Sequence, residues 1–343
     1  NDDLPEKSDD RACADEAAKD GTWGVPLRKG SMRKAVAITA VAMVFYFVLV
    51  VLSDVEEVGN AFQSFEWIYL APTLVLVVLN YLVRAERWHS YLGSIDLSLP
   101  RKRSYQLFMA GLSMSITPAK AGEAMKALFL RIEKGSPLER GIAVVFAERM
   151  TDLTGIMFLV GIGFIAFPYG LLSFVAVLAL VILVLVVLAT PGLSHRLVGW
   201  LKSKRLFNRI GVMAESGLHD ARSLLAGRSL VKGTVLGLVA WSAECVAFYC
   251  ILVGCSLDIA ILEAVFVYSF ASVVGAVSLM PGGMGTTEAT MIGLLVLLSA
   301  SAPMASFVVI LTRVCTLWFA VGLGLIFLVY YSKRSGHADP LAV

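Results

Sequence analysis

Charged residues are scarce in this sequence, and the short motifs of several large enzyme classes are absent from it. Only 16% of its 343 residues are charged, whereas 58% are hydrophobic, and the mean hydropathy is +0.78. Soluble domains carry about a quarter charged residues, so the composition indicates a chain made for a lipid bilayer. No GxGxxG, Walker or GxSxG motif occurs. The sequence therefore offers no sign of dinucleotide binding, nucleotide hydrolysis or serine-hydrolase chemistry.

Cysteine and histidine are also few, and their spacing does not suggest metal ligands. The five cysteines form no CxxC pair, and four of them lie in apolar segments, where we expect them to fill space in the core. The four histidines are scattered along the chain. We therefore expect no metal site and no cofactor.

Six apolar runs reach or approach the roughly 20 residues that a helix needs to cross a bilayer. They cover residues 35–52, 67–84, 141–167, 170–190, 233–256 and 305–331. Two further apolar regions, 104–130 and 261–300, are interrupted by proline, glycine and charged residues. We therefore predict an all-α polytopic membrane protein with about six spans and two broken helical hairpins.

Basic residues in the connecting segments orient these spans. Lysine and arginine precede the first span, flank the region 104–130 on both sides and recur in 191–232 and after 331, whereas the segments flanking 261–300 contain none. By the positive-inside rule, both termini are cytosolic and the two hairpins enter the membrane from opposite faces. We expect a plasma-membrane protein with a disordered tail at 1–30, repeats at 31–168 and 169–331, and a second tail at 332–343.

The two predicted repeats also resemble each other in sequence. Ser115 and Pro118 align with Ser278 and Pro281 at an offset of 163, and Arg149 aligns with Arg313 at an offset of 164. Glu123 also pairs loosely with Glu288. Apolar segments match by chance, so the coinciding proline, arginine and glutamate carry this comparison. Inverted repeats with broken helices near the membrane midplane are typical of secondary transporters.

The interruptions themselves predict a polar site. Proline ends a helix, and glycine allows close backbone approach and positive φ. The residues concerned are Pro118, Gly122, Pro281, Gly282, Gly283 and Gly285. Backbone groups freed by such breaks are tolerated only within protein or beside a water-filled cavity, and the N-termini of the half-helices attract anions. The alternative is a simple packing kink at a helix crossing.

Several charged residues lie within these apolar regions, where they are costly and usually functional. They are Arg84, Arg87, Lys120, Glu123, Lys126, Glu148, Arg149, Asp152, Glu244, Glu288 and Arg313. We predict that Arg149 and Arg313 bind an anionic headgroup, because the guanidinium fork matches phosphate. Lys120, Glu123, Glu288 and the prolines and glycines complete the predicted binding site. Glu148, Asp152 and Glu244 are expected to pair with cations or to carry protons.

Other interpretations of these charges stay open. Arg149 and Asp152 are three residues apart and can form a structural salt bridge, while Glu288 is a natural partner for Arg313. Lys120 and Lys126 can extend to the cytosolic surface. Arg84 and Arg87 are expected either to anchor a span end at the interface or to capture headgroups, and Lys126 is the third residue predicted at the headgroup entry.

The combination of "RAERW", "ITPAKAGEAMKALFL", "AERMTDLTG", "SLMPGGMGTTEA" and "LTRVCTLWF" resembles the lysylphosphatidylglycerol synthase transmembrane region, or flippase-like, family. The resemblance covers about residues 35–331 and implies a lipid translocase. In some members it also implies a membrane glycosyltransferase as partner. Because only a short tail follows residue 331, we expect no aminoacyl-lipid synthase activity, and we expect that the protein is not an enzyme.

We therefore predict a translocase that moves an anionic, phosphate-bearing lipid or a glycan linked to polyprenyl phosphate between leaflets. The alternatives are an ion-coupled carrier of a small anionic solute and a non-transporting partner of a glycosyltransferase. An intramembrane lipid enzyme is disfavoured, because no catalytic constellation is evident. Membrane lipid is the expected partner, and we expect no nucleic acid.

Overall fold

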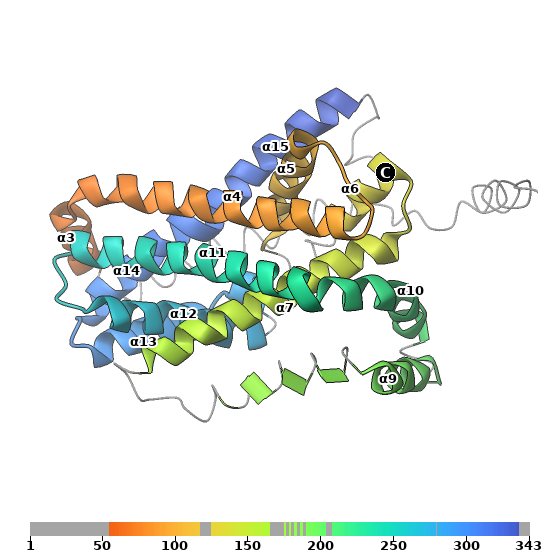
Figure 1. Ribbon diagram of the computed structural model, residues 1–343. Coiled ribbons are helices and arrows are strands. Elements are labelled where there is room, and N and C mark those ends of the chain that lie inside the picture. The colour runs from red at the N-terminus through yellow and green to blue at the C-terminus, as the bar shows by residue number, and fades with distance from the viewer. Residues whose placement is uncertain are drawn as a thin grey trace, which may run out of the picture.

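Every regular element in the described part of the chain is a helix (Figure 1). The computed structural model describes residues 55–116, 125–164, 190–203, 208–278 and 280–335, with a few positions between 175 and 187. The first half contains α3 (Val55–Ser64), η1 (Trp67–Tyr69), α4 (Leu70–Ser94), α5 (Arg101–Gly111), η2 (Leu112–Met114), α6 (Met125–Lys134) and α7 (Leu138–Gly163). The second half contains α9 (Pro191–Ser203), α10 (Asn208–Leu224), α11 (Gly227–Gly254), α12 (Ile261–Val277), η4 (Pro281–Gly283), α13 (Thr286–Leu297), α14 (Ala302–Arg313), the π-helical turn η5 (Val314–Trp318) and α15 (Phe319–Ser335).

Three of the predicted spans are confirmed as helices that are long and apolar enough to cross a membrane. They cover Trp67–Ser94, Gly227–Gly254 and Ala302–Tyr331. A fourth prediction coincides with α7, whose middle carries Glu148, Arg149 and Asp152. The predicted span 35–52 and most of 170–190 lie outside the described residues. The total of six spans, the re-entrant hairpins and the inverted topology stay predictions.

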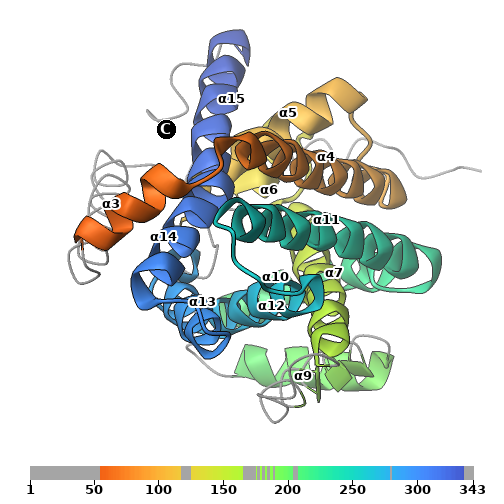
Figure 2. The same cartoon turned by 90° about the vertical axis from the view of Figure 1, so that its left-hand side faces the viewer.

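The long helices approach one another closely at glycines. Along α4, α7 and α11, the ribbons lie side by side in both views (Figures 1 and 2). A Cβ added to Gly155 of α7 would stand 3.0 Å from the backbone nitrogen of Leu238 in α11. One added to Gly237 would stand 3.0 Å from the carbonyl oxygen of Thr151. Small residues at crossings are typical of membrane helices, because lipid gives apolar faces no hydrophobic drive to associate.

Gly324 offers a direct test of this packing. Its Cβ would stand 2.1 Å from the backbone nitrogen of Ser113, so α15 lies directly on η2. We expect Gly324→Ala to destabilise the protein by about 1–3 kcal/mol, because backbone must move to admit the methyl group. Gly322→Ala is the matched control, since the same methyl meets nothing within 4 Å. Thermal unfolding in detergent measures both, and equal unfolding temperatures for the two variants would contradict the close contact.

The second interrupted region is confirmed as a helix break between α12 and α13. Gly282, Gly283 and Gly285 have φ of 60°, 69° and 86°, in the region that glycine tolerates best. Pro281 begins the short η4 turn between the two helices. In the first region, α5 leads directly into η2, which ends at Met114, and α6 begins at Met125. Residues 117–124 lie outside the described residues, and with them the predictions on Pro118, Lys120, Gly122 and Glu123.

Candidate functional site: a polar cavity at the centre of the helices

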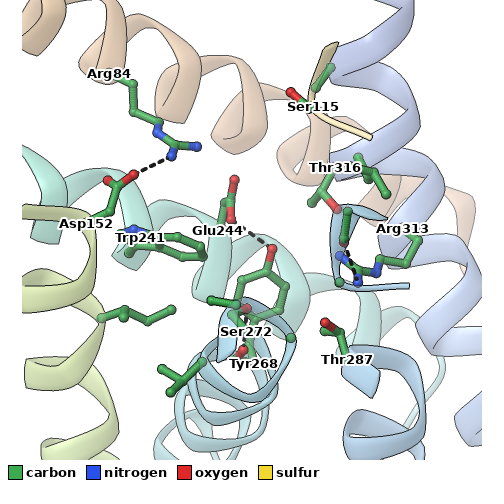
Figure 3. Close-up of a pocket in the computed structure, with 18 of the residues that line it drawn as sticks. Arg84, Ser115, Asp152, Trp241, Glu244, Tyr268, Ser272, Thr287, Arg313 and Thr316 are labelled. Atoms are coloured by element: carbon green, nitrogen blue, oxygen red, sulfur yellow. Dashed lines mark hydrogen bonds and ion pairs between the residues drawn. The ribbon is translucent and has the colours of Figure 1, made fainter. Parts of the chain in front are cut away.

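A cavity of about 260 Å³ lies where the helices converge (Figure 3). Its walls come from α4, α5, α7, α11, α12, α13, α14, α15 and the turns η2, η4 and η5. The polar side chains that line it include Tyr81, Arg84, Ser115, Arg149, Asp152, Glu244, Tyr268, Ser272, Thr287, Arg313 and Thr316. Gly282 and Gly283 of the helix break also line it. The structure thus brings together the broken motif and most of the predicted charges that lie in the described residues.

Asp152 is the centre of one wall. Its carboxylate accepts hydrogen bonds from Arg84 at 2.6 Å and from Arg87 at 2.7 Å, both from α4. Arg149, one helical turn before Asp152 on α7, lies 3.3 Å from the same carboxylate. The predicted Arg149–Asp152 pair is therefore present, within a larger cluster. Three guanidinium groups therefore converge on this one carboxylate.

Arg84 and Arg87 are buried in contacts within the protein and do not extend from a span end as exposed anchors; their depth relative to the membrane surface stays a prediction. The Arg87 side chain is 0% exposed and that of Arg84 is 11% exposed. The predicted span ended at residue 84, but α4 continues as far as Ser94. Both arginines therefore lie within the length of α4, and their side chains contact α7. The Arg84 guanidinium also lies 5.7 Å from the centre of the ring of Trp241, which lines the cavity as well.

Arg313 lies across the cavity from Asp152 (Figure 3) and pairs with Glu288, which is buried behind it and does not line the cavity. The Arg313 Nε donates to a Glu288 carboxylate oxygen at 2.7 Å, which confirms the predicted partner. The other carboxylate oxygen accepts a hydrogen bond from the backbone N–H of Gly285 at 2.7 Å. Glu288 therefore occupies the N-terminus of α13, the place where an anion is expected to bind.

Glu244 lies between these two walls (Figure 3). It accepts a hydrogen bond of 2.8 Å from the hydroxyl of Tyr268 on α12. The interpretation of the sequence included Glu244 but missed Tyr268, Trp241 and Thr287. These three residue types are ordinary in membrane helices, and only the packing of α11, α12 and α13 places them at the cavity.

Lys126 and Glu148 do not line the cavity. Their side chains are 2% and 0% exposed and form an ion pair of 2.6 Å. The Lys126 ammonium lies 5.0 Å from the Trp88 ring and 4.8 Å from the Phe108 ring. The expectation that Lys126 extends to the cytosolic surface is therefore wrong, because α6 packs its lysine inwards against α7. The pair ties these two helices together.

Comparison with known proteins identifies the family. The chain matches the family described as "Lysylphosphatidylglycerol synthase TM region" over residues 35–324. Among its relatives are two UPF0104 membrane proteins of Methanothermobacter thermautotrophicus. The first is 24% identical over 320 residues, which is 85% of this chain and 92% of the relative. The second is 22% identical over 330 residues, 89% of this chain and 96% of the relative.

A UPF0104 membrane protein of Pyrococcus horikoshii is 22% identical over 287 residues, which cover 75% of this chain and 85% of the relative. The match to the family extends over most of the chain and includes every residue that lines the cavity. This protein is therefore a membrane protein with transmembrane helices and belongs to the lysylphosphatidylglycerol synthase transmembrane-region family.

Proposed function

We propose that the protein is a lipid translocase that moves an anionic, phosphate-bearing lipid between the leaflets of the plasma membrane. The observation that carries this proposal is the cavity lined by Arg84, Arg149 and Arg313 within apolar helices. Charged side chains at membrane depth are costly and usually mark a substrate path. Arginine in particular donates paired hydrogen bonds to phosphate.

In this proposal, Asp152 and Glu288 hold the arginines when no substrate is bound. Arg149 and Arg313 are 25% and 12% exposed, so their guanidinium groups are within reach of a ligand in the cavity. An anionic headgroup displaces one or both carboxylates and takes over their hydrogen bonds. The tail stays outside the polar cavity, and the two repeats rock to open the cavity to the other leaflet. The protein's own residues bind and release the headgroup, and no covalent bond forms or breaks.

Lipids that copurify with the protein from native membranes test this proposal. We expect mass spectrometry to find a phosphate-bearing lipid enriched with the wild type and lost from the Arg149→Gln/Arg313→Gln/Glu288→Gln variant, in which the buried Glu288 carboxylate is not left without its counter-ion. That result names the substrate class and places its site together. Bulk membrane lipid in the same proportions on both proteins would contradict the proposal.

One observation favours a second candidate, an ion-coupled carrier of a small anionic solute. Glu244 and Tyr268 place a carboxylate and a neutral hydrogen-bond donor in the middle of the cavity, where a proton can be taken up and released. Uptake into vesicles that depends on a pH gradient, with no dependence on a lipid tail, would favour this carrier.

A further inference from the structure

A second hollow lies at the α3 end of the bundle, opposite α9 and α10 (Figure 1). Its volume is about 700 Å³, and its walls come from α3, η1, the start of α4, and α14, η5 and α15. All the residues that line it are apolar, apart from a glycine and a cysteine. We call it the apolar groove, and Gly59, Phe62, Leu74, Val314 and Phe319 are among its residues.

The apolar groove continues the line of the polar cavity, because the same two walls enclose both. On α4, Leu74 lines the groove and Tyr81 lines the cavity, about 10 Å further along the helix axis. On the other wall, Phe319 lines the groove and its neighbour Ala320 lines the cavity. The two hollows are therefore successive parts of one seam between α4 and the α14–α15 segment.

The rings of Tyr81 and Phe319 stand between the two hollows. They stack with their centres 6.3 Å apart and their planes 21° apart. The Tyr81 hydroxyl donates a hydrogen bond of 2.6 Å to the carbonyl oxygen of Thr316, within the π-helical turn η5. Such turns recur at functional sites, because they alter the regular hydrogen bonding of a helix. Here the turn holds the aromatic pair that separates a polar space from an apolar one.

We propose that the apolar groove binds the hydrocarbon tail of the lipid whose anionic headgroup binds in the cavity. The inference rests on the proposed translocase. Phe62 and Val314 at the groove are 54% and 50% exposed, so a tail reaches it sideways from the bilayer. Lipid chains are as apolar as the lining, and nothing in a bilayer drives such helix faces to close on each other. A polar pocket for the head beside an apolar one for the tail matches an amphipathic ligand.

Photo-cross-linking in native membranes identifies the occupant of the groove. We place p-benzoylphenylalanine at Gly59 in the groove, or at Gly322, an exposed position of α15 outside it. An added Cβ meets nothing within 4 Å at either glycine, so the two positions are matched. Adducts are identified by mass spectrometry in the otherwise wild-type chain and in the Arg149→Gln variant.

We expect a phosphate-bearing lipid at position 59, reduced about 100-fold by Arg149→Gln, because two charge-assisted hydrogen bonds to its headgroup are lost and each contributes roughly tenfold. At position 322 we expect bulk lipid that is unaffected by the substitution. Bulk lipid at both positions would overturn the tail site, and so would a cross-link to residues 35–52. If copurified lipid still depends on Arg149 and Arg313, the translocase stands and the tail site alone falls.

Discussion

Replacing Arg149 with glutamine is expected to reduce lipid transfer by about 100-fold, since two charge-assisted hydrogen bonds to phosphate are lost and each contributes roughly tenfold. The fold should tolerate this change. Asp152 keeps its bonds to Arg84 and Arg87, at 2.6 and 2.7 Å, when Arg149 at 3.3 Å is removed. The variant therefore separates loss of function from loss of structure. Transfer of the copurified lipid between leaflets of reconstituted vesicles measures the rate.

Two further variants sharpen this experiment. Arg149→Lys keeps the charge but loses the planar fork, so its transfer rate should lie between those of the wild type and Arg149→Gln. Arg131→Gln removes an exposed arginine of α6 that does not line the cavity, and its rate should equal that of the wild type. Wild-type transfer by Arg149→Gln would show that Arg149 does not bind the headgroup.

The corresponding change on the opposite wall needs a different design. Arg313 is the partner of Glu288, whose side chain is 0% exposed. Removing the arginine alone would leave a buried carboxylate without its counter-ion, a change that destabilises the fold as well as the site. The double variant Arg313→Gln/Glu288→Gln avoids that charge. Its transfer rate reports on binding with less interference from folding.

Local features of the sequence predicted the parts of the structure that depend on local physics. Continuous apolar runs predicted α4, α11 and the α14–α15 segment. Proline followed by three glycines predicted the break at 281–285. The Arg149–Asp152 pair follows from a spacing of three residues on one helix. Each of these predictions needs only the geometry of one element.

Contacts between distant helices could not be predicted in this way. Arg84 and Arg87 are 68 and 65 residues from Asp152, and their meeting depends on how α4 packs against α7. The sequence placed these arginines at a span end because hydropathy falls where charges begin. Charged residues do not end a helix, so α4 continues to Ser94, and its two arginines are paired within the protein. For the same reason, hydropathy gave no indication that Lys126 is buried.

Asp152→Asn is expected to cause the largest loss of stability of any single substitution at the cavity. Three arginines share this carboxylate, and Arg87 is fully buried. Removing one partner of a buried ion pair costs about 3–5 kcal/mol, because the remaining charge stays without compensation. We expect the midpoint of thermal unfolding in detergent to fall by about 5 °C. The matched control is Glu86→Gln on α4, whose partner Arg101 is 69% exposed, and an exposed pair contributes only about 0–1 kcal/mol.

A second substitution tests whether uncompensated charge is the cause. Arg87→Met in the Asp152→Asn background removes the most deeply buried of the three cations and keeps an apolar side chain of similar length. We expect this double variant to regain part of the lost stability, since the introduced asparagine still offers an oxygen to Arg84 and only Arg84 and Arg149, which line the cavity, remain charged. If it is instead less stable than Asp152→Asn alone, packing around Arg87 and not charge balance holds α4 to α7. Recovery of stability without recovery of transfer would show that Asp152 has a second role, which is to hold Arg149 in place for the headgroup.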